Sequence, residues 1–173
     1  MYERKGAATF QGDPLTVVGD TPKIGAPAPD VTVLANDLSP IALSSLRGKT
    51  VIISSVPSLD GAVCDTETRR FNKEAAALGD DIVILTVSMD LPFAQARWCG
   101  AAGIDKVKTV SDHRDASFGT AYGTLIKEMR LLARTVFVVD KGGVLRYVQE
   151  VGEIMKEPDY DEVIAAAKKA AAG

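Results

Sequence analysis

Two cysteines, Cys64 and Cys99, carry the most reactive side chains in this sequence. With a single histidine beside them, they are too few for a disulfide framework or a structural zinc site. Ionised cysteine is a strong nucleophile, and a cysteine pair in a reducing compartment is typical of redox chemistry. We therefore predict a redox protein that uses neither a metal nor an organic cofactor.

Helical spacing places Cys64 at the start of a helix. Phe71, Ala75 and Leu78 recur every three to four residues, and the same face continues back through Thr68 to Cys64. Lowering the pKa of a thiol from about 8.5 to about 6 takes about 3.4 kcal/mol. A helix N-terminus contributes typically about 0.3 to 1 kcal/mol, and up to about 2 in a buried geometry. An active thiolate at this position therefore needs a cation as well.

Arg134 is the best placed cation in the sequence. The acidic residues near the cysteine, Asp65 and Glu67, both disfavour a second negative charge. Arg134 directly precedes an apolar run, residues 135–139, that is typical of a buried strand, so it can approach Cys64 from another element. We predict that Arg134 stabilises the thiolate and binds the molecule that the thiolate attacks.

Cys99 is expected near the end of a short helix that Asp90 and Pro92 begin, with Gly100 and Gly103 as the stop signals. The helix dipole disfavours a thiolate there. This asymmetry predicts that Cys64 ionises and attacks, and that Cys99 then condenses with the oxidised Cys64 to form a disulfide.

Other interpretations of the two cysteines stay open at this point. Position alone favours two small core side chains, which is common for free cysteines. A permanent disulfide could stabilise the fold by roughly 3 to 4 kcal/mol, but a reducing compartment argues against it. A thiol–disulfide oxidoreductase usually carries a Cys-X-X-Cys motif, which Cys64 and Cys99 do not form.

Composition limits the classes of partner. The chain of 173 residues has 20 Lys and Arg against 23 Asp and Glu, for a net charge of -3, and 46% hydrophobic residues. This charge offers no general attraction to nucleic acid or to an acidic membrane surface. No apolar segment is suited to a secretory signal or a membrane span. We predict a cytoplasmic protein whose residues 1–173 form a single domain.

The order of apolar runs predicts an α/β fold. Continuous β-branched runs at residues 50–55, 81–87 and 135–139 indicate buried central strands. Residues 145–150 follow a turn and should pair antiparallel with the preceding strand. An N-terminal hairpin is predicted from residues 8–10 and 15–18, and a short strand from residues 31–34. Further helices are predicted at residues 91–100, 116–122 and 159–171.

Several ordered segments together resemble one known family. They are PSLD at 57–60, CDTETRRFN at 64–72, LPFAQARWCGAAGI at 91–104, SDHRDASFGTAYG at 111–123, LLARTVFVVD at 131–140 and EPDY at 157–160. The sequence resembles the atypical two-cysteine thiol peroxidases of the peroxiredoxin family over nearly its whole length. This resemblance implies a thioredoxin-like fold, with a central mixed β-sheet flanked by helices.

The resemblance also implies a reaction. Cys64 attacks hydrogen peroxide or an organic hydroperoxide and becomes a sulfenic acid, Cys99 resolves it within the same chain, and thioredoxin reduces the disulfide. Arg134 is then the active-site arginine and Pro57 shields the attacking cysteine. The family also implies a homodimer.

Gly61 departs from the family pattern, which places a threonine three residues before the attacking cysteine. A hydrogen bond to a charged group contributes about 1.5 to 3 kcal/mol, so loss of that hydroxyl could slow attack roughly ten- to a hundredfold. Three explanations are open: a water or Ser58 replaces the hydroxyl, the enzyme is naturally slow, or Gly61 is an altered position. A slow or non-catalytic redox sensor that passes oxidation to a protein partner is the alternative function.

Overall fold

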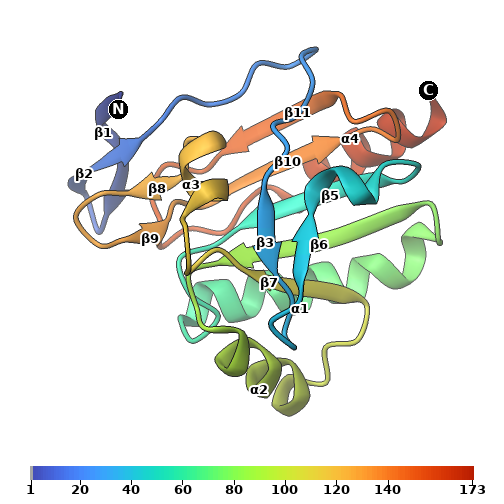
Figure 1. Ribbon diagram of the computed structural model, residues 1–173, viewed down its shortest axis with the longest axis horizontal. Helices are drawn as coiled ribbons and strands as arrows, with labels where there is room; N and C mark the ends of the chain where they lie inside the picture. Colours follow the sequence, from blue (N-terminus) through green and yellow to red (C-terminus); the bar gives the residue numbers. More distant parts are fainter. Residues whose placement is uncertain (1) are drawn as a thin grey trace.

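The computed structural model describes residues 2–173 and is organised around a seven-stranded mixed sheet (Figure 1). Its strand order is β11-β10-β5-β6-β7-β3-β4. Strands β5, β6 and β7 run parallel, whereas β10 pairs antiparallel with both β5 and β11. The bounds are Thr32–Leu34 for β3, Pro40–Ala42 for β4, Thr50–Ser55 for β5, Ile82–Ser88 for β6, Val107–Ser111 for β7, Thr135–Val139 for β10 and Leu145–Glu150 for β11. The predicted mixed sheet is confirmed.

Helices cover both faces of this sheet. Successive side chains of the central strands point to opposite faces and are buried on both, so each face needs a covering layer. On one face, Ile52 and Val138 pack with Phe71 of α1 (Ala62–Leu78) and Val163 of α4 (Tyr160–Ala172). On the other face, Ile53 and its neighbours pack with α3 (Ser117–Ala121) and the 3₁₀ turn η1 (Leu43–Leu46). Helix α2 (Pro92–Ala102) connects β6 to β7.

The predicted N-terminal hairpin is present and belongs to a second, four-stranded sheet. Strands β1 (Glu3–Phe10) and β2 (Asp13–Val18) pair antiparallel, and the sheet continues through β8 (Leu125–Ile126) and β9 (Leu131–Leu132). Gln11 and Gly12 form the turn with positive φ angles of 50° and 88°. This small sheet matters for function because Phe10 and Leu131 extend from it toward the candidate site.

Three parts of the sheets were not predicted: β4, β7 and the β8–β9 pair. Strand β7 contains the exposed Lys108 between two buried residues and lacks a continuous apolar run. Strands β8 and β9 have two residues each, so they exist only through pairing within the small sheet. Helix α1 begins at Ala62, two residues before the predicted start. Helix α2 continues through Gly100, where the predicted helix ended, and is capped by the left-handed Gly103, the second of the two expected stop signals.

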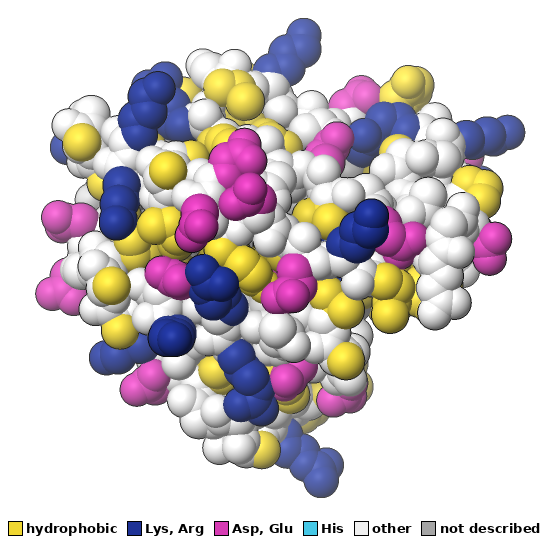
Figure 2. Space-filling view, turned by 180° about the vertical axis from the view of Figure 1, so that it is seen from behind, with side chains coloured by type: hydrophobic (Ala, Val, Ile, Leu, Met, Phe, Trp, Pro, Cys, Tyr) yellow, Lys and Arg dark blue, Asp and Glu magenta, His cyan; other side chains and the backbone are white. Residues whose placement is uncertain are grey.

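The surface carries mixed charge. On the face shown in Figure 2, basic and acidic side chains are interspersed, so its described residues present both signs together. Across residues 2–173, none of the helices is long and apolar enough to cross a membrane.

Candidate active site

Cys64 lies in the first turn of α1, after the loop that leaves the end of β5. Its side chain is only 3% exposed and packs with Val56 and Leu59. The helix N-terminus favours a negative charge at this position, whereas the apolar surroundings oppose one. The sequence-based placement of Cys64 on the inward face of α1 is confirmed.

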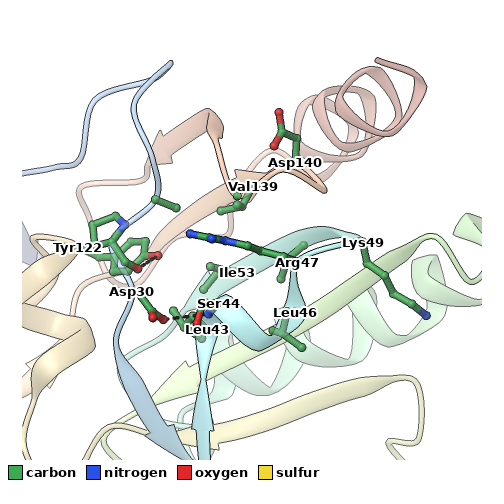
Figure 3. A pocket seen from close by; sticks show the side chains of 14 residues that line it. Asp30, Leu43, Ser44, Leu46, Arg47, Lys49, Ile53, Tyr122, Val139 and Asp140 are labelled. Carbon is green, nitrogen blue, oxygen red and sulfur yellow. Dashed lines mark hydrogen bonds between the residues drawn. The ribbon is translucent and has the colours of Figure 1, made fainter.

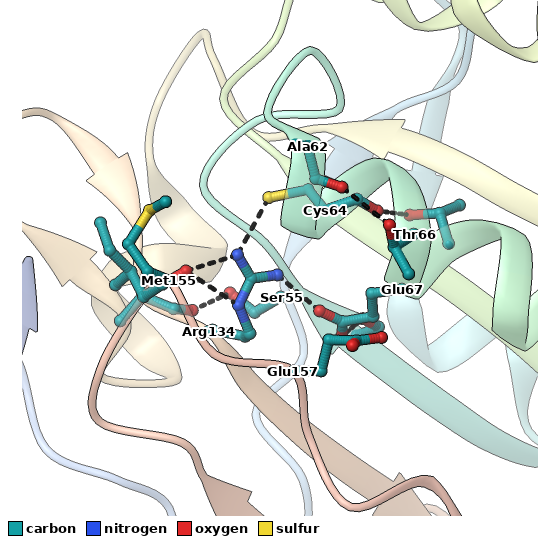
Figure 4. Close-up of polar contacts among 12 residues, drawn as sticks. Ser55, Ala62, Cys64, Thr66, Glu67, Arg134, Met155 and Glu157 are labelled. Carbon is teal, nitrogen blue, oxygen red and sulfur yellow. Dashed lines mark hydrogen bonds and ion pairs between the residues drawn. The ribbon is translucent and has the colours of Figure 1, made fainter. Parts of the chain in front are cut away.

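Arg134 reaches Cys64 because of the pairing between two central strands. Thr135, the first residue of β10, lies opposite Ser55, the last residue of β5, and the loop to Cys64 starts directly after Ser55. Arg134 Nη2 donates a hydrogen bond to Cys64 Sγ at 3.2 Å (Figure 4). The Ile154 carbonyl accepts hydrogen bonds from Arg134 Nη2 at 2.6 Å and from Nε at 3.2 Å, which orients the guanidinium.

Arg134 also forms a fully buried ion pair with Glu67. Its Nη1 lies 2.5 Å from Glu67 Oε2 (Figure 4). The Ser54 hydroxyl donates a hydrogen bond to Glu67 Oε1 at 2.8 Å. Glu67 is 0% exposed and lies one helical turn after Cys64. The sequence indicated the opposing charge of Glu67 but not this ion pair, although the shared helix face placed both groups on the same side of α1.

One cation therefore serves two acids. Burial raises the pKa of the Cys64 thiol, and the charge of Arg134 opposes this effect but is the smaller influence, while Glu67 raises the pKa further. Burial likewise raises the pKa of Glu67. Burial is thus the largest influence on the Cys64 pKa; Arg134 offsets part of it, and Glu67, which shares that cation, adds a smaller increase.

Replacing Glu67 with glutamine should lower the pKa of Cys64. The glutamine amide can direct its oxygen to Arg134 and its NH₂ group to Ser54, so packing is retained while a negative charge is removed. We expect the pH midpoint of Cys64 alkylation, measured in a Cys99→Ser background, to move to lower pH. Glu74→Gln is the matched control, since Glu74 lies on the same helix but pairs with Arg70 at a partly exposed position. A midpoint that stays in place or moves to higher pH would contradict the shared-cation interpretation.

A pocket of about 210 Å³ opens in front of Cys64 and Arg134. Apart from these two residues and Ser58, its lining is apolar or small: Phe10, Pro57, Gly61, Ala62, Val63, Met129, Leu131, Ile154 and Met155. The structure thus brings together four residues singled out in the sequence, namely Pro57, Gly61, Cys64 and Arg134. The small sheet contributes one wall of this pocket through Phe10 and Leu131.

Gly61 has an extended backbone that any residue can adopt, with φ -76° and ψ 141°. A Cβ atom there would lie 3.7 Å from Cys64 Sγ and 3.3 Å from the Ser58 carbonyl oxygen. The Ser58 hydroxyl donates instead to Asp90 Oδ1 at 2.7 Å, and the Leu59 N–H donates to Asp90 Oδ2 at 2.8 Å. This arrangement argues against Ser58 as the replacement for the missing hydroxyl. Asp90 lies outside α2 and holds the loop before Cys64.

Cys99 lies apart from this pocket. Its partly buried thiol is 3.3 Å from Thr109 Oγ1, in a separate hollow of about 260 Å³ that Asn36, Lys106 and Lys108 also line. Within residues 2–173, both cysteines are free thiols. A disulfide between them therefore requires a change in the position of α2.

A third concavity, on the opposite side of the large sheet, lacks comparable chemistry (Figure 3). Arg47, Tyr122 and Asp140 are among its lining residues, and its volume of about 30 Å³ is that of roughly one water molecule. Among residues 2–173, no group of three or more His, Cys, Asp or Glu side chains is arranged to hold a metal ion. The reactive thiol thus places the candidate site at Cys64.

Comparison with known proteins agrees with this arrangement. The family model described as Redoxin matches residues 23–164. The chain belongs to the Redoxin family. A thiol peroxidase of Bacillus subtilis is 58% identical over 160 residues, which covers 92% of this chain and 95% of the relative. A thiol peroxidase of Halalkalibacterium halodurans is 56% identical over 162 residues, or 94% and 97% of the two chains.

A solved structure shows the same fold. The crystal structure of a peroxiredoxin-like protein from Aquifex aeolicus has a TM-score of 0.89 at 40% identity, covering 95% of this chain and 97% of that one. The resemblance to thiol peroxidases and the thioredoxin-like fold predicted from the sequence are therefore confirmed.

Proposed function

We propose that this Redoxin-family chain is a thiol-dependent peroxidase that reduces hydrogen peroxide and organic hydroperoxides at Cys64. The observation that carries this function is the 3.2 Å contact between Cys64 Sγ and Arg134 Nη2 at the base of a largely apolar pocket. The thiol peroxidases that are more than half identical to this chain support the same activity.

In the first step, the Cys64 thiolate attacks one peroxide oxygen and the O–O bond breaks. The sulfur becomes a sulfenic acid, and the leaving oxygen departs as an alcohol or water after taking up a proton. The guanidinium of Arg134 offers several N–H donors in a fixed geometry, so it can hold the peroxide oxygens and stabilise the charge that develops on the leaving oxygen. Pro57 and Gly61 form the wall against which the peroxide would bind.

The apolar lining suits the hydrocarbon part of an organic hydroperoxide. Phe10, Leu131 and Ile154 supply apolar surface close to the thiol, and Met129 and Met155 lie partly exposed at the opening of the pocket. A hydroperoxide with an alkyl group would bury that surface while its two oxygens contact Arg134.

In the second step, the Cys99 thiol attacks the sulfenic sulfur of Cys64, water leaves and an internal disulfide forms. A thioredoxin-type dithiol protein then reduces this disulfide and supplies the two electrons that each cycle consumes. Because such a reductant belongs to a reducing compartment, we propose that the protein acts in the cytoplasm.

Mass spectrometry of the intact chain tests both cysteine roles. After one equivalent of peroxide, the wild-type chain should form the Cys64–Cys99 disulfide, and Cys99→Ser should stop at a sulfenic acid with one added oxygen. Cys64→Ser should remain unoxidised. Oxidation of Cys99 in the Cys64→Ser variant, together with no oxidation of Cys64 in the Cys99→Ser variant, would reverse the roles assigned to the two cysteines.

A redox sensor or relay that turns over slowly is the second candidate, and the missing side chain at Gly61 is the observation that favours it. Peroxide consumption coupled to thioredoxin and its reductase separates the two. Many cycles per chain indicate an enzyme, whereas a single oxidation followed by stable capture of a partner protein indicates a sensor.

We also propose that the single-domain protein acts as a homodimer. Large exposed apolar side chains include Met129 and Met155, which line the pocket, and Leu91 and Phe93 at the start of α2. Phe93 is 65% exposed, and a second copy of the chain would cover it. Sedimentation analysis of the purified protein measures this association directly.

A further inference from the structure

Helices α1 and α2 are joined through the residues that follow Cys64 and precede Cys99. The Trp98 indole Nε1 donates a hydrogen bond to Asp65 Oδ1 at 2.9 Å. The neighbours of the two reactive cysteines therefore hold each other while the thiols themselves lie in separate hollows.

Arg69 strengthens the same junction from α1. Its Nε donates to Asp65 Oδ2 at 3.0 Å and its Nη1 donates to the Ala102 carbonyl in the last turn of α2 at 3.3 Å. Its guanidinium carbon also lies 5.8 Å from the centroid of the Trp98 ring, within the range of a cation–π contact. We name Asp65, Arg69 and Trp98 together the α1–α2 clasp.

The clasp holds the half of α2 that carries Cys99. The first half has its own anchor, the fully buried Gln95, whose Nε2 donates to Ser88 Oγ at 2.9 Å and to the Val110 carbonyl at 2.8 Å. The last turns can therefore unwind toward Gly103 while the first turn stays in place.

The Trp98 ring also packs against the apolar cluster of Val56, Leu59 and Cys64. Withdrawal of this ring would open the apolar surroundings of Cys64 on the side where α2 lies. A single movement of the last turns of α2 would thus both release Cys99 from Thr109 and uncover a path to Cys64.

We infer that the α1–α2 clasp sets the rate of disulfide formation, because it must open before Cys99 can reach the Cys64 sulfenic acid; this inference rests on the proposed peroxidase function. Its three residues are positioning residues and take no part in the attack on peroxide. Opening of the clasp leads to the disulfide with loss of water. While it stays closed, a second hydroperoxide can oxidise the sulfenic acid to a sulfinic acid and leave as an alcohol.

Two clasp variants test this inference by different routes. Arg69→Gln removes the charge over Trp98 and the ion pair with Asp65, while Trp98→Phe keeps an aromatic ring but loses the indole N–H. We expect the rate of disulfide formation to rise about three- to tenfold in both variants. Acid quenching and mass spectrometry, after addition of one equivalent of peroxide, measure this rate. The sulfinic acid formed per turnover under excess peroxide should fall by a similar factor.

Two further measurements separate a clasp from a general structural effect. Arg70→Gln is the matched control, because this neighbouring arginine pairs with Glu74 and contacts Tyr160 away from α2. It should leave the disulfide rate unchanged. Trp98 is the single tryptophan of the chain, so its fluorescence should change together with disulfide formation, and faster in Arg69→Gln than in the wild type.

The rate of the first oxidation of Cys64 should stay the same in Arg69→Gln. An unchanged or slower disulfide step in both clasp variants, or equal acceleration in Arg70→Gln, would overturn the inference while leaving the peroxidase function intact. Failure of the wild-type chain to form any internal disulfide would instead overturn the proposed function, and the inference with it.

Discussion

Arg134→Met should lower the second-order rate of Cys64 oxidation by peroxide about 10²- to 10³-fold, the usual cost of removing a donor that stabilises developing negative charge. The variant loses the hydrogen bond from Nη2 to Cys64 Sγ and the group that would hold the peroxide oxygens. Stopped-flow measurement of the first oxidation, at several peroxide concentrations, gives this rate directly.

The same substitution should destabilise the fold by about 3 to 5 kcal/mol, because it leaves the carboxylate of Glu67 buried without its cation, with only the Ser54 hydroxyl as a partner. Burial already raises the pKa of Glu67, and a group whose pKa is higher in the folded state loses its stabilising contribution as the pH rises. The stability deficit of Arg134→Met, measured by denaturant unfolding, should therefore grow from acidic to neutral pH.

A double variant separates the chemical and structural roles of Arg134. Arg134→Met with Glu67→Gln removes the unpaired buried charge and should recover much of the lost stability but little of the lost rate. Recovery of the peroxide rate along with the stability would mean that Arg134 acts only as a structural residue.

Gly61→Thr should raise the rate of Cys64 oxidation roughly ten- to a hundredfold, since a hydrogen bond to a charged group contributes about 1.5 to 3 kcal/mol. The extended backbone at this position accepts threonine, and its Cβ would lie 3.7 Å from Cys64 Sγ, which places the hydroxyl within reach of the sulfur. The 3.3 Å approach to the Ser58 carbonyl requires a small shift of the loop.

Gly61→Val is the matched control for this prediction. Valine has the same branched shape and stiffens the loop equally, but it has no hydroxyl. A threonine variant that is faster than the valine variant assigns the gain to the hydrogen bond. Equal rates in the two would assign it to the loop, and no gain in either would indicate that a water already fills the place of the hydroxyl.

Local patterns in the sequence were enough to predict most of the sheet and the helix that carries Cys64. Strands β5 and β10 are buried at every position, so their apolar runs are continuous, and the face of α1 that contains Phe71 repeats at the helical period. Pro92 correctly marked the start of α2, whereas its end was predicted at Gly100, three residues before the Gly103 cap. Strand β7 escaped prediction because Lys108 interrupts its apolar pattern.

The sequence alone also determined that an attacking Cys64 needs a cation, and it pointed to Arg134. Only the tertiary structure showed how that cation is shared. The Glu67–Arg134 ion pair and the Trp98–Asp65 hydrogen bond join residues far apart in the chain, through the β5–β10 register and the packing of α2 on α1. Such contacts have no local period, and the burial that raises the Cys64 pKa exists only once those elements have packed.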